Sequence, residues 1–460
     1  MLETSIAEAL AAQLRGNLIA REDPGYDEAR ALFNGMIDRK PAMIAQCSGT
    51  ADVITCVNFA RENGMSLSVK GGGHGVAGNA LCDDGLVIDL SRMNGVLVDP
   101  QRRTAQVQGG ATLGDLDHET QKFGLAVPAG MVSTTGVAGL TLGGGVGHLQ
   151  RRFGLTVDNL MAANTDTADG SLVRASESDN PDLFWALRGG GGNFGVVTSF
   201  EFNLHQVGPE ILNARVFHPF DDAREVIQFL RDFMAGAPKE LGCLCGIRRL
   251  SPRPQVPEAH HGRLAVALTA INSRREATEE TTLLRELASF GNPILSTVTP
   301  MQYTALQSQS DVAFPKGYRN YWKAHYLSSL PDEAIDTILE NAGTVPGEFS
   351  GIAFETMGGA INELDQSATA FPHRNAKFGL GIYGAWADES RDREVIAWVR
   401  QLHEAMEPFA TGGAYVNSLQ GDAGDEFRTA YGANFERLRE IKKRYDPQGL
   451  FDAHQRLVVR

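Results

Sequence analysis

Hydrophobic and polar residues recur along this chain in two periods, which mark its helices and strands. Apolar residues return every three to four positions over 51–63, so we expect a helix there that ends before Gly64. The apolar run over 65–69 predicts a short strand. Thr112 followed by Asp115 is close to a capping box and predicts that a helix begins at this point.

Beyond about residue 206 the pattern becomes coarser, with longer apolar runs separated by amphipathic stretches. Strands are expected over 213–217, 243–248, 264–270, 320–327, 350–356 and 378–386. Helices are expected over 221–234, 274–289, 331–341, 389–406 and 425–445. The mixture of helices and short strands predicts an α+β protein.

Composition limits the class of protein. A chain of 460 residues has room for about two to three domains, and 42% hydrophobic with 21% charged residues is typical of a soluble globular protein. The net charge of −14 argues against nucleic acid or a membrane as the main partner. The chain has no apolar run of about 18 residues, and its start has no secretory pattern. Five scattered cysteines predict reduced thiols, so we expect a cytoplasmic protein.

Glycine is concentrated in three short clusters. The first, over 71–75, encloses His74, and the others lie over 143–145 and 189–192. Glycine is needed where the backbone takes a positive φ or touches another group closely. Three such clusters indicate backbone that surrounds a large cofactor.

Two of these clusters match the dinucleotide pattern G-x-G-x-x-G, at residues 73–78 and 190–195. The pattern indicates a Rossmann site only between a strand and a helix. The first match leads from a strand into a polar turn, and the second leads from a helix into a strand. We therefore exclude a Rossmann site. Successive backbone N–H groups of a glycine loop still suit a pyrophosphate, and residues 68–78 contain no acidic side chain.

The motifs together resemble the berberine bridge enzyme-like branch of the vanillyl-alcohol oxidase superfamily, and specifically a bacterial type. The resemblance rests on Lys70 to Gly75, Gly136 to Gly147, Arg152 to Leu155 with Asp158 and Asn159, Gly190 to Val197, Tyr415 to Asn417, Tyr431 to Asn434, and Tyr445 to Pro447 with Phe451. It implies a PCMH-type FAD-binding domain of two α/β subdomains, formed by 1–205 and completed by 411–460. It also implies a substrate domain over 206–410, with an antiparallel sheet backed by helices.

In this family a histidine is bonded covalently to FAD, and the matching residue here is His74. The FAD-binding positions implied by the resemblance are Lys70, Gly71, Gly72, Gly73, His74, Gly75, Gly78, Gly130, Thr134, Thr135, Gly136, Gly139, Gly143, Gly144, Gly192, Gly195, Val197, Asn417 and Asn434. Many relatives hold the flavin through a cysteine as well, but that position is Val132 here. We therefore expect a single covalent bond, through His74. Thr135 lies where a small β-branched side chain goes with oxidase activity in the family, which favours dioxygen as electron acceptor.

The catalytic base of the plant relatives is absent, because the two positions that would carry it are Gly379 and Gly381. These glycines would leave the substrate pocket wider. Alternation along 319–327 places Tyr321 and His325 on one face of a strand, and they are candidates for proton transfer. Tyr415, which precedes the expected flavin contact Asn417, is the third candidate.

The expected function is FAD-dependent oxidation of a small molecule, with hydride transfer from a substrate carbon to the flavin. The substrate is an alcohol, a sugar or a secondary metabolite. An amine oxidase of the hydroxynicotine type is an alternative, although no acidic residue stands out as an anchor for a cation. A flavin-retaining protein without redox activity is a further alternative. No metal site is expected, and the oligomeric state stays open.

Overall fold

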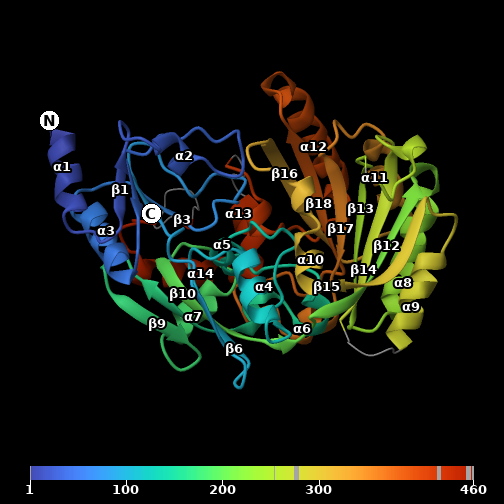
Figure 1. The fold of residues 1–460 in the computed structure, drawn as a ribbon, viewed down its shortest axis with the longest axis horizontal. Helices are drawn as coiled ribbons and strands as arrows, with labels where there is room; N and C mark the ends of the chain where they lie inside the picture. The colour runs from blue at the N-terminus through green and yellow to red at the C-terminus, as the bar shows by residue number, and fades with distance from the viewer. Residues whose placement is uncertain (1, 253, 274–278, 422–425, 452–456, 458–460) are drawn as a thin grey trace.

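A computed structural model describes residues 2–252, 254–273, 279–421, 426–451 and 457 (Figure 1). Two mainly N-terminal sheets lie beside a large antiparallel sheet, which is at the right in Figure 1. The large sheet takes all its strands from residues 210–386. Residues near the C-terminus return to the N-terminal sheets, so the first part of the molecule is built from both ends of the described chain.

The first sheet has four short strands in the order β1-β2-β4-β3. These are β1 (Asn17–Ala20), β2 (Met43–Gln46), β3 (Leu67–Lys70) and β4 (Leu86–Asp89). The pairs β2/β4 and β3/β4 are parallel, and β1/β2 is antiparallel. Three helices accompany this sheet, namely α1 (Leu2–Ala11), α2 (Tyr26–Arg30) and α3 (Thr50–Glu62). The predicted helix over 51–63 and the predicted strand after it are therefore confirmed to within two residues.

The second sheet has five antiparallel strands in the order β5-β6-β10-β8-β9. These are β5 (Val96–Asp99), β6 (Thr104–Gln108), β8 (Leu160–Asp166), β9 (Leu172–Ser176) and β10 (Val196–Asn203), and a small pair joins β7 (Leu125–Ala126) to β11 (His205–Gln206). The helices of this part are α4 (Leu113–Gln121), α5 (Val137–Leu142), α6 (Gln150–Phe153) and α7 (Pro181–Leu187). Helix α4 begins with the predicted capping box between Thr112 and Asp115.

The third sheet has seven antiparallel strands in the order β15-β12-β14-β13-β17-β18-β16. These are β12 (Glu210–Pro219), β13 (Leu241–Arg249), β14 (Leu264–Asn272), β15 (Leu295–Gln302), β16 (Arg319–Leu327), β17 (Gly351–Thr356) and β18 (Phe378–Trp386). Strand β15 was not predicted, because its exposed residues interrupt the apolar pattern.

One face of this sheet is covered by α8 (Ala223–Gly236), α9 (Glu279–Ser289), α11 (Asp332–Ala342) and α12 (Asp392–Met406). Helices α8 and α9 lie at the right edge of Figure 1, on the side away from the N-terminal sheets. Helix α10 (Tyr303–Ser308) lies against α4 instead. The predicted residues 274–278 of the helix before Ser289 lie outside the described residues. The predicted antiparallel sheet backed by helices is confirmed.

The predicted single helix over 425–445 is wrong. The described chain forms α13 (Glu426–Tyr431), a turn over Gly432–Asn434, and then α14 (Phe435–Tyr445). Gly432 has φ +50°, and the Asn434 side chain donates to the carbonyl oxygens of Gln366, Thr369 and Ala370. The chain therefore turns at Gly432, and Asn434 binds the segment over 366–370.

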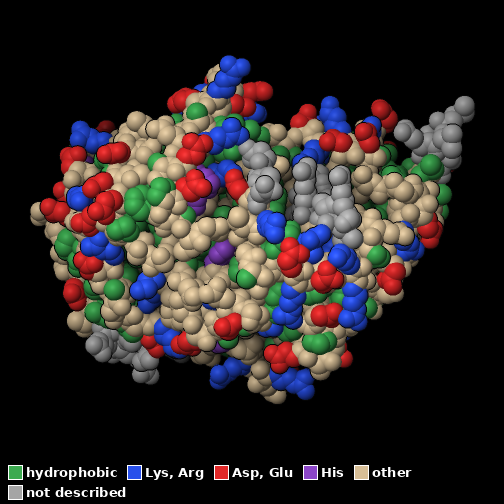
Figure 2. All heavy atoms as spheres, turned by 180° about the vertical axis from the view of Figure 1, so that it is seen from behind, with side chains coloured by type: hydrophobic (Ala, Val, Ile, Leu, Met, Phe, Trp, Pro, Cys, Tyr) green, Lys and Arg blue, Asp and Glu red, His purple; other side chains and the backbone are tan. Residues whose placement is uncertain are grey.

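Charged side chains of both signs lie on the rear face of the molecule. Figure 2 shows acidic and basic side chains interspersed over the rear face. Within the described residues, no helix is both long and apolar enough to cross a membrane.

Candidate active site

Two glycine segments from different parts of the sequence pack backbone against backbone beside the first sheet. A Cβ added to Gly72 would lie 2.4 Å from the Gly136 nitrogen, and a Cβ added to Gly136 would lie 2.4 Å from the Gly72 nitrogen. Real Cβ atoms do not approach backbone this closely, so both positions require glycine. The contact fixes the 71–75 loop against the start of α5.

A cavity of about 410 Å³ lies between these segments and the seven-stranded sheet. Its lining includes the predicted cofactor positions Gly71, Gly72, Gly73, His74, Gly75, Gly130, Thr135, Gly136, Gly139, Gly192, Gly195, Val197 and Asn417. The glycine-rich segments over 71–75, 130–139 and 191–197 form one side of the cavity, which we call the glycine wall. Tyr415, predicted beside Asn417, also lines the cavity.

The remaining predicted cofactor positions do not line this cavity. They are Lys70, Gly78, Thr134, Gly143, Gly144 and Asn434. The Lys70 ammonium donates to the Ala29 carbonyl and pairs with Asp89. Gly143 leaves space for the Asn417 side chain, because its Cβ would lie 2.3 Å from Asn417 Oδ1. Lys70 thus holds the start of the 71–75 loop, and Gly143 makes room for Asn417, which lines the cavity.

Three glycines of the wall need a different explanation. Gly75, Gly139 and Gly192 line the cavity, none of them has a positive φ, and a Cβ on any of them would meet no protein atom within 4 Å. Neither backbone conformation nor protein packing therefore requires glycine there. A large ligand lying directly against the backbone does require it. The glycine wall thus fits a flavin dinucleotide.

His74 lies within this wall as a neutral imidazole. Its ring stacks on Phe33, with the ring centroids 3.9 Å apart. Its Nε2 atom is buried and has no hydrogen-bond partner among the described residues. Burial lowers the pKa of His74 to about 4. A neutral imidazole with a free nitrogen is the form that attacks carbon as a nucleophile.

The Tyr415 hydroxyl oxygen links Asn417 to the glycine cluster over 143–145. This oxygen accepts from the Asn417 side-chain amide at 3.0 Å and from the Gly145 backbone at 3.2 Å. Burial raises the pKa of Tyr415 to about 12. The hydroxyl is therefore protonated at neutral pH and keeps its own proton as a donor.

The opposite side of the cavity is formed by side chains of the seven-stranded sheet, and we call it the sheet wall. Leu244, Trp322, Ala353, Glu355 and Tyr383 contribute to it. The rings of Trp322 and Tyr383 pack edge to face, with centroids 5.1 Å apart. The strand register places these residues on the face that looks away from α8, α9, α11 and α12.

Glu355 is the carboxylate of the sheet wall. It lies on β17 opposite Gly379, and its Oε2 would be 3.7 Å from a Cβ at that glycine. Burial raises the pKa of Glu355 to about 7. Burial raises the pKa of Tyr383 above its usual range, and the charge of the nearby Glu355 carboxylate raises it further. Glu355 can therefore change protonation near neutral pH inside the cavity.

The expectation that Gly379 and Gly381 widen the pocket is wrong. A Cβ on Gly381 would lie 2.3 Å from the Tyr383 hydroxyl, so this tyrosine occupies the space beside the glycine. Glu355 approaches the other glycine from the neighbouring strand. Side chains from two other positions thus lie in the space beside these glycines.

The structure also corrects the expectation that Tyr321 and His325 face the cavity. Both lie on the opposite face of β16, against α12. The Tyr321 hydroxyl accepts from Arg400, and His325 stacks on His403 with centroids 4.0 Å apart. The period of two was correct, but it did not say which face of the strand looks toward the cavity.

Sequence reasoning missed Glu355, Trp322 and Tyr383. The one available signal was the placement of Glu355, next to Phe354, in a mostly apolar predicted strand. An acidic residue on a mostly buried strand needs a partner or a function. That signal was too weak to select Glu355 before the register was known.

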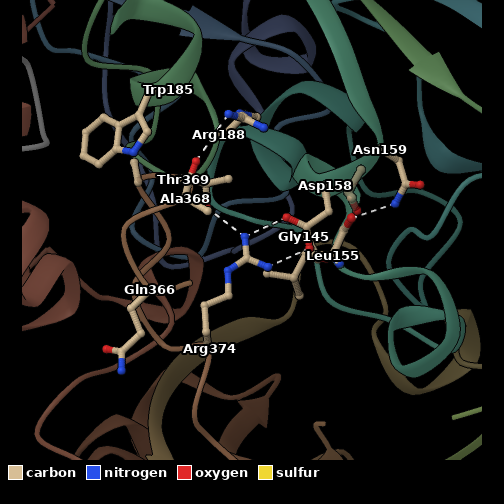
Figure 3. Close-up of polar contacts among 12 residues, drawn as sticks. Gly145, Leu155, Asp158, Asn159, Trp185, Arg188, Gln366, Ala368, Thr369 and Arg374 are labelled. Atoms are coloured by element: carbon tan, nitrogen blue, oxygen red, sulfur yellow. Dashed lines mark hydrogen bonds and ion pairs between the residues drawn. The ribbon is translucent and has the colours of Figure 1, made fainter. Parts of the chain in front are cut away.

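A buried ion pair joins the N-terminal part of the molecule to a loop of the large sheet. The Arg374 guanidinium is fully buried and donates to both carboxylate oxygens of Asp158 at 2.7 and 2.6 Å. Figure 3 shows Arg374 reaching Asp158 from the loop before β18. Asp158 also accepts from the Leu155 backbone. Asp158 thus anchors the segment directly before β8 to the loop between β17 and β18 of the large sheet.

Comparison with known proteins defines the class. The FAD binding domain family matches residues 41–176, and the berberine and berberine-like family matches residues 414–457. An FAD-linked oxidoreductase of Dictyostelium discoideum is 31% identical over 454 residues, covering 97% of this chain and 96% of that protein. The protein is therefore an FAD-linked oxidoreductase.

Solved structures agree with this class. 6-Hydroxy-D-nicotine oxidase from Arthrobacter nicotinovorans superimposes with a TM-score of 0.87 at 25% identity, covering 97% of this chain and 98% of that one. Xylooligosaccharide oxidase from Myceliophthora thermophila, in complex with xylobiose, gives 0.85 at 26% identity, covering 97% of both chains. The chain belongs to the berberine bridge enzyme-like family of FAD-linked oxidoreductases.

Proposed function

We propose that this enzyme is an oxidase that oxidises a small alcohol or amine with FAD held by one covalent bond, through His74. The observation that carries the proposal is the glycine wall, where three glycines face the cavity without any protein atom that requires them. FAD, when bound there, supplies a two-electron acceptor for a carbon–hydrogen bond of the substrate. The remaining steps fall to side chains of this chain.

Glu355 is the residue that accepts the substrate's proton. An alcohol or a protonated amine must lose a proton as its carbon is oxidised, and a carboxylate with a pKa of about 7 is well matched to that task. Above that pH the group is ionised and competent, and below it the group is protonated and inactive. Tyr415, which stays protonated, can donate a hydrogen bond that orients the substrate.

A single covalent link is supported by two residues of the glycine wall. His74 offers a free, neutral ring nitrogen, and Val132 lines the cavity where the doubly linked relatives carry cysteine. We expect the flavin colour to stay with wild-type protein after acid precipitation and to be released from His74→Ala. Complete loss of colour from the wild type would contradict the covalent link.

Use of dioxygen is supported by Thr135, whose small β-branched side chain lines the cavity. We expect substrate turnover to consume oxygen and form hydrogen peroxide in equal amounts, as an oxygen electrode with a peroxidase assay would measure. Turnover that needs an added dye and consumes no oxygen would identify a dehydrogenase instead.

Glu355 also favours an amine as substrate, because it supplies the cavity carboxylate that sequence reasoning did not find. The (R)-6-hydroxynicotine oxidase of Paenarthrobacter nicotinovorans is 40% identical to this chain over 199 residues, 43% of each protein. A panel of alcohols, sugars and amines, tested for anaerobic bleaching of the flavin, separates these classes. Failure of every compound to reduce the flavin would favour the alternative of a non-redox flavoprotein.

A further inference from the structure

A shallow line of small residues leads away from the reaction site across the seven-stranded sheet. The register joins Ala353 on β17 to Gly246 on β13 and then to Ala267 on β14. We call these three residues the trough. Phe217 on β12 pairs with Ala267 and closes its far end. Tyr383, which occupies the space beside Gly381, borders the near end.

Gly246 keeps the middle of the trough open. Its φ is not positive, and a Cβ there would meet only two backbone oxygens, at 3.8 and 4.0 Å. Protein packing therefore does not require glycine at this position.

The trough is the floor of a second cavity that adjoins the first. This cavity has a volume of about 150 Å³, and five of its lining residues also line the flavin cavity. The shared residues are Leu244, Ser310, Phe314, Ala353 and Tyr383. A ligand can therefore extend from one cavity into the other past Ala353.

Two arginines line this second cavity, one on each side of the trough. Arg215 lies in register with Thr269, Leu244 and Glu355 on successive strands. Three strand spacings of about 4.8 Å separate it from Glu355, or about 14 Å. Arg248 borders the trough on the other side, beside Gly351. Both residues are partly exposed, and the Arg215 guanidinium lies 5.5 Å from the centroid of the Phe217 ring.

The remaining polar lining also fits a ligand. His148 lines the second cavity, is only 8% exposed, and its Nε2 has no hydrogen-bond partner among the described residues. Burial lowers the pKa of His148 to about 4, so the ring is neutral and can donate to or accept from a ligand. The acidic residue of the lining is Glu348, which is exposed.

We propose that the substrate is elongated, with its oxidised carbon near Glu355 and an anionic end group, a carboxylate or a phosphate, bound by Arg215 and Arg248 in the second cavity. This inference rests on the proposed function, because it assumes that the substrate reacts at the sheet wall. The arginines match such a group because guanidinium donates paired hydrogen bonds to anionic oxygens.

The test is a calorimetric titration of the FAD-loaded enzyme with phenylalkanoates of increasing chain length. Each carboxylate is compared with its neutral primary amide and with the phenylalkyl phosphate of equal length. We expect one anionic series to bind about tenfold or more tighter than the amides, but only once the chain is long enough to span the trough. The tighter anionic series identifies the end group. Equal affinity of anions and amides at every length overturns the inference.

Substitutions locate the effect. Arg215→Met and Arg248→Met should each remove most of the anion preference and leave amide binding unchanged. Arg249→Met is the matched control, because Arg249 follows Arg248 on β13 but donates to the Gly262 and Val345 carbonyls and does not line the cavity. Loss of the preference in Arg249→Met but not in the other two variants contradicts the assignment.

These outcomes are separable from those for the proposed function, because calorimetry needs no turnover. A length-dependent anion preference without flavin reduction by any alcohol or amine refutes the oxidase and retains the anion site. Flavin reduction by neutral compounds, with no anion preference at any length, retains the oxidase and refutes the anion site.

Discussion

The two sides of the flavin cavity are built in different ways. The glycine wall is made by backbone, and its geometry depends on where a Cβ cannot be placed, as at Gly72 and Gly136. The sheet wall is made by side chains, and its chemistry depends on which residues the strand register brings to one face, as at Glu355 and Trp322. Under the proposed function, the first wall holds the cofactor and the second presents groups to the substrate. A change in one wall should therefore affect a different measured quantity from a change in the other.

The largest effect is expected within the glycine wall. Gly72→Ala places a Cβ against the Gly136 backbone, so we expect little folded, FAD-containing protein, as flavin absorbance and thermal unfolding of the purified chain would show. Gly139→Ala is the control. Its Cβ meets no protein atom, and alanine favours a helix by about 1 kcal/mol over glycine. We expect this variant to fold normally and to lose FAD. If the two variants behaved alike, the distinction between a glycine required by protein packing and a glycine required by the ligand would be wrong.

The next largest effect is expected at the buried ion pair between Arg374 and Asp158. Arg374→Met leaves the buried Asp158 carboxylate without its bidentate partner, so we expect the free energy of unfolding to fall by about 3–5 kcal/mol in chemical denaturation. Arg439→Met removes an ion pair to the well-exposed Glu436 and should cost at most about 1 kcal/mol. Similar losses in both variants would argue against a clamp at Arg374.

The smallest effect is expected on the helix-facing side of the sheet. Tyr321→Phe removes the hydroxyl that accepts from Arg400, at a cost of about 1 kcal/mol in stability. The rate of anaerobic flavin reduction should stay unchanged, because Tyr321 does not line the cavity. A fall of tenfold or more in that rate would show that Tyr321 takes part in flavin reduction.

The same contrast explains how much the sequence could predict. The glycine wall was predictable because backbone constraints appear directly as residue types, and most of the predicted cofactor positions, including the loop around His74, line one cavity. Asn434 and Lys70 were placed in the wall by resemblance, but the structure shows them supporting other segments. Residue type alone does not say on which side of a loop a side chain lies.

The sheet wall was less predictable because its residues depend on long-range pairing. The strands of Tyr321 and of Glu355 were both predicted, yet the choice of face requires knowing that α12 covers one side of β16. A shift of one residue exchanges the two faces of a strand completely. The catalytic candidates on β16 were therefore chosen from the face that does not look toward the cavity, and Glu355 was found only from the structure.

The central claim is that the sheet wall performs the proton transfer while the glycine wall holds the cofactor. The most direct measurement is the pH dependence of anaerobic flavin reduction in Glu355→Gln, at matched FAD content. We predict that the wild-type rate rises with pH through about 7, where the Glu355 carboxylate ionises. The variant should lose this rise and be slower by about 10²–10⁴-fold, with its FAD still bound. A variant that keeps the wild-type rate and pH profile would contradict the account.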